Sequence, residues 1–151
     1  MLRAMTVHVR YLGRARARVP ARTLRRSAER MLAALGLEHG ELSILMCDDA
    51  VMRSLNRRYR EIDRSTDVLA FSMAEGQPLA SSGAVLLGDI ALSLPTAARQ
   101  ARAARRDTLA ELTMLLAHGL LHLLGYDHAT PPEARRMRAR TDALVAAAQA
   151  R

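Results

Sequence analysis

Three of the five histidines in this 151-residue chain fall within residues 118–128, at spacings that suit a metal ion. His118 and His122 are four residues apart in a leucine-rich stretch of helical periodicity, so both imidazoles should project from one face of a helix. Gly125 can adopt a left-handed conformation that turns the chain and returns His128 to the same point. Three neutral imidazoles are a typical zinc set that leaves a fourth position for water or substrate. The spacing therefore predicts one catalytic metal ion.

The alternative is that these histidines are core or surface residues that meet by chance. Unpaired imidazoles in a helix otherwise full of leucine would be costly to bury, and this cost favours the metal. Zinc is the first choice for the ion, although imidazole also binds nickel, copper and iron. We therefore expect one Zn²⁺, with other divalent transition metals as alternatives.

The same spacing, His-x3-His-x2-Gly-x2-His, occurs in the metzincin proteases. In those enzymes a glutamate directly follows the first histidine and acts as the general base. In this chain that position is Gly119, which has no side chain to move a proton. Peptide hydrolysis by the usual route is therefore disfavoured, and a metalloprotease remains a distant alternative.

The charge of the chain favours a polyanionic partner. All 23 basic residues are arginine, the formal net charge is +8, and the pI is about 11.2. Such a field attracts nucleic acid, although the same charge could serve solubility alone. Aromatic residues make up only 3% of the chain, so a platform for base stacking is not expected. Contacts with RNA should be mainly to phosphate and shape.

Length and composition predict one domain over residues 1–151, large enough for a core of its own. Cys47 is the single cysteine and cannot form an internal disulfide, which fits a reducing cytoplasm. No apolar run resembles a signal peptide or approaches the roughly 20 residues of a membrane span. We therefore expect a soluble, cytoplasmic protein without a membrane partner.

Periodicity predicts strands alternating with helices. Strands are expected at residues 6–11, 41–47, 68–73 and 85–92. Helices are expected from Pro20 through Leu35, from the N-cap pair Asp48 and Asp49 through Tyr59, from Thr108 through Leu123, and from Pro131 through Val145. Thr108 and Glu111 have the spacing of a capping box, and Gly125 is placed to end that helix. These elements indicate an α+β or α/β fold, and periodicity alone does not decide between the two.

The chain resembles the YbeY family of bacterial metal-dependent endoribonucleases in three separate blocks. Residues 118–128 match the signature H-G-x-L-H-L-x-G-Y-D-H in full, and residues 55–71 match L-N-x-x-Y-R-x-x-D-x-x-T-D-V-L-x-F. Residues 87–90 match the L-G-D-I strand, and the resemblance extends from about residue 5 to residue 144. Departures lie away from the histidines: Ser65 replaces a frequent proline, and arginines replace glutamates in the last helix, where they bear on partner contacts.

The resemblance implies a zincin-like α+β domain, with a small mixed sheet packed with helices and the metal site on a helix and the following turn. It makes His118, His122 and His128 the metal ligands and Arg60 the functional arginine. It also implies maturation of the 3′ end of small-subunit rRNA and ribosome quality control. The expected partners are rRNA and the small ribosomal subunit, with ribosomal proteins and an assembly GTPase, and no DNA.

Physical chemistry gives Arg60 a suitable role. A guanidinium binds phosphate through two parallel hydrogen bonds and stabilises the charge that builds on its oxygens. The alternative is a surface ion pair between Arg60 and Asp63 or Asp67, which would contribute little.

Three residues near Arg60 or the histidines in the sequence are expected to have structural or supporting roles. Tyr59 and Phe71 are expected in the core rather than at the substrate. Asp127 either orients a histidine ligand or caps the turn that precedes His128.

The hypothesis from the sequence is hydrolysis of RNA at internal sites by a metal-activated water, with the 2′-OH of the RNA as an alternative nucleophile. A rival hypothesis is an RNA-binding assembly factor whose metal only stabilises the fold. The open fourth position of a three-histidine site argues for the enzyme.

Overall fold

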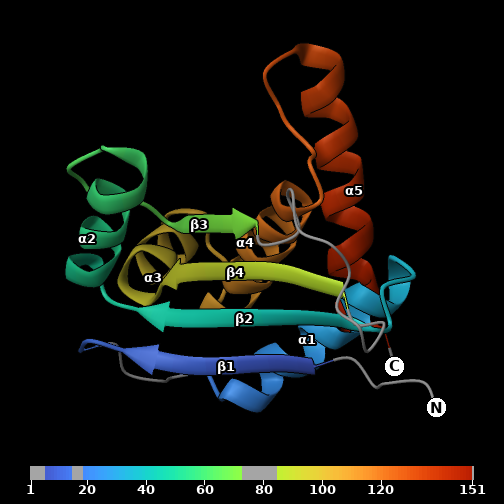
Figure 1. The fold of residues 1–151 in the computed structure, drawn as a ribbon, viewed down its shortest axis with the longest axis horizontal. Helices are drawn as coiled ribbons and strands as arrows, with labels where there is room; N and C mark the ends of the chain where they lie inside the picture. Colours follow the sequence, from blue (N-terminus) through green and yellow to red (C-terminus); the bar gives the residue numbers. More distant parts are fainter. Residues whose placement is uncertain (1–5, 15–18, 73–84, 151) are drawn as a thin grey trace.

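The computed structural model describes residues 6–14, 19–72 and 85–150, which form a four-stranded sheet and five helices (Figure 1). The strands are β1 (Thr6–Leu12), β2 (Gly40–Cys47), β3 (Val68–Ser72) and β4 (Val85–Ser93). The helices are α1 (Ala21–Ala34), α2 (Asp49–Arg60), α3 (Leu94–Ala103), α4 (Thr108–Leu123) and α5 (Pro131–Gln149). In the order β1-β2-β4-β3, β1, β2 and β4 are parallel and β3 is antiparallel. The expected α+β fold with a small mixed sheet is confirmed.

Alternate residues along the strands face two separate cores. On one face Ile44 and Ile90 join the larger core, which α1 and α4 cover and on which α5 packs as an outer layer (Figure 1). On the other face Leu69 and Ala91 join a smaller core with Met52 of α2. None of the helices in the described ranges is both long and apolar enough to span a membrane. The edge strand β3 therefore lies between α4 on one face and α2 on the other.

All the predicted strands and helices are present, with ends within a few residues, although Met73 of the third predicted strand lies outside the described residues. Asp48 caps α2 as expected. Helix α3 was not expected. Its start carries ordinary signals, because Ser93 Oγ accepts a hydrogen bond from the Thr96 N–H and Pro95 lies in the first turn. Ser93 is also the last residue of β4, so the strand continues directly into the helix. No loop separates the two elements, and the sequence pattern therefore does not show where one ends and the other begins.

The capping box predicted for α4 is wrong. Asp107 is the N-cap, and its Oδ1 accepts a hydrogen bond from the Ala110 N–H at 2.7 Å. Thr108 is the first helical residue instead. Glu111 is buried, and its carboxylate accepts a hydrogen bond from Arg106 at 2.7 Å, so it does not reach back to the helix start. A buried carboxylate needs a cationic partner, and this requirement outweighs the capping role.

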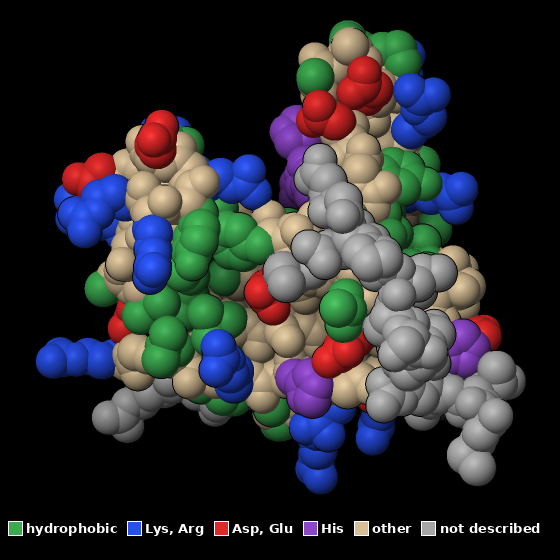
Figure 2. All heavy atoms as spheres, viewed as in Figure 1, with side chains coloured by type: hydrophobic (Ala, Val, Ile, Leu, Met, Phe, Trp, Pro, Cys, Tyr) green, Lys and Arg blue, Asp and Glu red, His purple; other side chains and the backbone are tan. Residues whose placement is uncertain are grey.

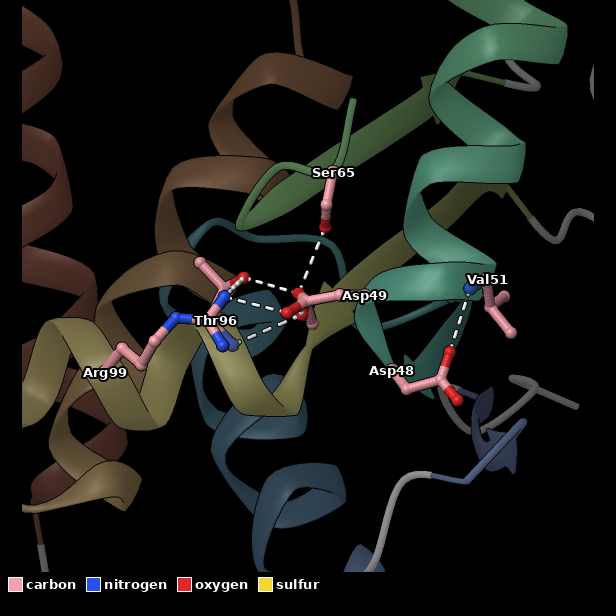
Figure 3. Close-up of polar contacts among 7 residues, drawn as sticks. Asp48, Asp49, Val51, Ser65, Thr96 and Arg99 are labelled. Carbon is pink, nitrogen blue, oxygen red and sulfur yellow. Dashed lines mark hydrogen bonds and ion pairs between the residues drawn. The ribbon is translucent and has the colours of Figure 1, made fainter. Parts of the chain in front are cut away.

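One carboxylate joins four segments of the chain at the start of α2 (Figure 3). Asp49 accepts hydrogen bonds from the hydroxyls of Ser65 at 3.1 Å, Ser93 at 2.6 Å and Thr96 at 2.6 Å, and from the Arg99 guanidinium at 2.8 Å. Burial opposes ionisation of this group, but the hydrogen bonds outweigh it and hold the pKa of Asp49 well below its usual range. The network connects α2 with the segment before β3, the end of β4 and the start of α3.

Asp49→Asn should lower the free energy of unfolding by about 1–2 kcal/mol at pH 7, because hydrogen bonds to a charged acceptor are lost. The folded-state pKa lies below the unfolded value of about 3.9, so this contribution is complete above that pH and declines as the solution is acidified further. Urea unfolding from pH 7 down to pH 2 should therefore show wild type and variant converging in acid. Asp63→Asn, at an exposed ion pair, is the control and should change little. A difference that does not depend on pH would contradict this role.

Candidate metal centre

Helix α4 approaches the sheet very closely at Gly119. A Cβ atom on this buried residue would lie 3.0 Å from Cγ2 of Ile90 in β4 and 3.1 Å from Cγ2 of Val68 in β3. These distances are shorter than ordinary van der Waals contacts, so a side chain here would push the helix away from the sheet. The glutamate of the metzincins would meet the core at this position. Gly119 thus has a packing role as well as lacking a general base.

The end of α4 and the turn after it bring three histidines together. His118 and His122 lie one turn apart and half-buried, and their Nε2 atoms are 3.1 Å apart. Gly125 follows α4 with a φ of 91°, in the expected left-handed conformation. The ring of His128 then lies with its centroid 5.3 Å from that of His122 and 5.7 Å from that of His118. One ligand nitrogen from each residue lies within 4.8 Å of the other two.

This donor set fits a single metal ion. Two imidazole nitrogens bound at about 2.0–2.1 Å with tetrahedral geometry would be about 3.3 Å apart, close to the 3.1 Å between His118 and His122. Burial lowers the pKa of His118, and the positive charges of His122 and His128 lower it further. Burial and then His128 also lower the pKa of His122. Neutral imidazoles are therefore favoured, which is the form that binds a metal.

Arg60 is anchored to the edge strand β3. It is the last residue of α2, and its guanidinium donates a hydrogen bond to the Ala70 carbonyl of β3 at 2.7 Å. Its Cζ atom lies 5.7 Å from the ring centroid of Phe71. Its positive charge is one of the factors that lower the pKa of His122, so the two groups are electrostatic neighbours. Arg60 is thus linked electrostatically to one of the three histidines, His122.

The surface ion pairs considered as the alternative for Arg60 are not formed. Asp63 instead accepts two hydrogen bonds from Arg53, at 2.8 and 3.0 Å. Asp67 accepts one from Gln100 at 3.2 Å. The hydrogen bond of Arg60 to β3 uses one of its five N–H groups. The guanidinium therefore keeps donors for a ligand.

The structure shows the positions of Tyr59 and Asp127, whose roles were predicted from the sequence. Tyr59 was expected in the core but is 56% exposed, because the end of α2 projects beyond the sheet (Figure 1). Its ring contacts the half-buried Phe71 edge-on, with centroids 5.2 Å apart. Asp127 caps the turn, since its Oδ1 accepts a hydrogen bond from the His128 N–H at 2.7 Å. The same oxygen is 4.0 Å from the His128 ring, too far for a hydrogen bond.

The histidines border a hollow in the surface. Figure 2 shows the molecule hollowed above β3, between α2 and α5, with histidine side chains on the α5 side. A cavity of about 430 Å³ adjoins His118 and His128 and reaches between α4 and α5. The α5 side of this region could not be foreseen from the sequence, because its residues form no motif and are spaced one helical turn apart. The Asp67 side was considered only as a partner for Arg60.

An α+β fold with a mixed sheet and three convergent imidazoles at the end of one helix defines a zincin-like protein that could hold one metal ion. Comparison with known proteins gives the family. Residues 14–149 match the family described as Endoribonuclease YbeY, and the chain belongs to this family.

Similar proteins agree with this assignment. A protein named Endoribonuclease YbeY from Anaeromyxobacter sp. (strain Fw109-5) is 53% identical over 134 residues, which cover 89% of this chain and 67% of that protein. A protein of the same name from Pelotomaculum thermopropionicum is 43% identical over 124 residues, which cover 81% of this chain and 82% of that protein. The solution structure of TM1509 from Thermotoga maritima has a similar fold, with a TM-score of 0.63, 22% identity, and coverage of 93% and 88%.

Gly119→Val should lower the free energy of unfolding by about 1–3 kcal/mol, because the branched side chain overpacks the contact with β3 and β4. Gly119→Ala should fail to show the gain of about 1 kcal/mol that alanine brings at an open helical position. Thermal or urea unfolding measures both effects, and Ala139→Val at an exposed position of α5 controls for helix propensity. Wild-type stability in the valine variant would contradict the close approach.

Proposed function

We propose that this protein is a metal-dependent endoribonuclease that hydrolyses phosphodiester bonds within RNA. The observation that carries the proposal is the convergence of three imidazoles on one point, in a chain whose relatives are named endoribonucleases. Burial lowers the pKa of His118 and His122, and Arg60 contributes to the lowering at His122. The net charge of +8, supplied entirely by arginine, favours a polyanionic substrate. These features support an enzyme acting on RNA.

His118, His122 and His128 would hold the ion, which we take to be zinc, with other divalent transition metals as alternatives. Bound there, the ion supplies Lewis-acid chemistry that lowers the pKa of water and polarises a phosphoryl oxygen. Among the described residues, three neighbouring ligands come together rather than four, as in catalytic zinc sites. The hollow beside the histidines gives RNA access to them.

Arg60 is the proposed catalytic cation. Its hydrogen bond to Ala70 and the Phe71 ring beneath it restrict the orientation of the guanidinium. The remaining N–H groups can donate a bidentate pair to the phosphate and stabilise the negative charge of the transition state. An arginine placed in this way costs little reorganisation when RNA binds.

The nucleophile can be water or the 2′-OH of the RNA. Gly119 lacks the general base of the metzincins, and this absence disfavours peptide hydrolysis. The products of RNA cleavage separate the two nucleophiles, because only attack by the 2′-OH forms a 2′,3′-cyclic phosphate.

The biological substrate that we propose is ribosomal RNA in the cytoplasm, in the maturation of the small-subunit 3′ end and in ribosome quality control. Partners would be the small ribosomal subunit, ribosomal proteins and an assembly GTPase, with no DNA. The three matching sequence blocks support this setting. The scarcity of aromatic residues supports recognition by phosphate contacts and shape.

Wild-type protein should cleave a precursor fragment that spans the 3′ end of small-subunit rRNA. His122→Ala removes a ligand and should slow cleavage at least about 100-fold. Arg60→Ala should slow it about 100- to 1,000-fold, because charge stabilisation in the transition state is lost. His8→Ala and Arg58→Ala, at exposed positions of the same residue types, are matched controls and should cleave like wild type.

Equal cleavage by all five preparations would indicate a contaminating ribonuclease and remove the support for the proposal. Tight RNA binding without cleavage, combined with unfolding on metal removal, would favour the rival assembly factor with a structural metal.

A further inference from the structure

The cavity beside the histidines has the size of a small-ligand pocket. Its volume is about 430 Å³, within the roughly 300–1,000 Å³ typical of such sites. His118 and His128 form part of its lining, so a group bound in it would lie next to the proposed metal. The opposite wall belongs to α5.

Part of the lining is apolar. Met114 and Leu115 of α4 and Ala134 and Met137 of α5 contribute to it, with Leu115 and Met137 almost fully buried beneath the surface. Methionine side chains are flexible and polarisable, and they adapt to the face of an aromatic ring. A chain with few aromatic residues can in this way hold a base without a stacking platform.

Besides the two histidines and Arg138, the polar part of the lining consists of acceptors. The Asp67 carboxylate is fixed by hydrogen bonds from the Val68 N–H at 2.7 Å and from Gln100 at 3.2 Å, and it retains lone pairs. The Thr141 hydroxyl donates to the helix backbone at 2.7 Å, which leaves its oxygen as an acceptor. Asp142 adds a second, exposed carboxylate.

The position of these carboxylates is informative because the rest of α5 is strongly basic. Arg138 also lines the cavity, and further arginines stand at positions 135, 136 and 140. Carboxylates close to a polyanion repel its phosphates, unless they face groups that donate hydrogen bonds. In a nucleic acid these donors are the amino and ring N–H groups of the bases.

We propose that this cavity binds the nucleobase next to the cleaved phosphate and favours bases that carry an exocyclic amino group. The inference rests on the proposed endoribonuclease function. The carboxylates of Asp67 and Asp142 accept hydrogen bonds from the amino group, while the apolar walls contact the faces of the ring. Uracil presents a carbonyl oxygen where cytosine has its amino group, so it meets an acceptor with an acceptor. Arg138 supplies a donor for the phosphate of the same nucleotide.

Binding of mononucleotides tests the cavity without any reliance on cleavage. In protein with ¹³C-labelled methionine methyl groups, cytidine 5′-monophosphate should shift the Met114 and Met137 signals and leave those of Met31, Met46 and Met52 in place. Uridine 5′-monophosphate should bind about tenfold more weakly. Asp142→Asn should narrow this difference to below about threefold, because an amide can donate to the uracil carbonyl. Glu38→Gln, the same charge change at an exposed loop position, is the control and should retain the full difference in binding between the two nucleotides.

Shifts confined to other methionines, or equal binding of the two nucleotides, would overturn the inference. Short single-stranded RNAs that differ only in the base beside the cleaved bond separate this failure from that of the proposed function. No cleavage of any RNA would contradict the endoribonuclease function. The methionine signals would still show whether the cavity binds a nucleotide. Equal cleavage next to all four bases, unchanged by Asp142→Asn, would contradict the base pocket and leave the endoribonuclease standing.

Discussion

Helix α4 meets the sheet through a residue that has no side chain, and the candidate metal centre depends on this contact. With Gly119 against Ile90 and Val68, the distance and rotation of the helix are fixed by packing. His118 and His122 are then presented together beyond the edge strand, where the turn at Gly125 returns His128 to them. The same glycine replaces the glutamate that a metzincin would use, so close packing and the loss of that general base have one cause.

The opposite wall of the hollow depends on a different interaction. Asp49 holds the start of α2 against the ends of β4 and the segment before β3, and Arg60 at the other end of α2 bonds to β3 itself. The same strand therefore positions both helices: α4 packs against β3 by van der Waals contact, and α2 is joined to it by hydrogen bonds. Arg60 of α2 and Gly119 of α4, from distant segments of the chain, both contact β3. Rigid placement of this kind is what charge stabilisation in a transition state requires.

The sequence predicted the features that local spacing controls. The histidine cluster, the glycine turn and most strands and helices follow from periodicity and from residues that favour one backbone conformation. Helix α3 was missed because Ser93 both ends a strand and caps a helix. Glu111 was misassigned because its partner Arg106 and its burial are tertiary facts. The anchoring of Arg60 could not be foreseen either, since its partner is a backbone carbonyl that any residue at position 70 would supply.

The most direct test of the central claim is the rate of RNA cleavage as folded, metal-free protein is titrated with Zn²⁺. If His118, His122 and His128 form one metal centre at which RNA is cleaved, the rate should rise in proportion to the metal and become constant at one equivalent per chain. Cleavage by the metal-free protein at the full rate, or a rate that stays at zero while one equivalent binds, would contradict the account.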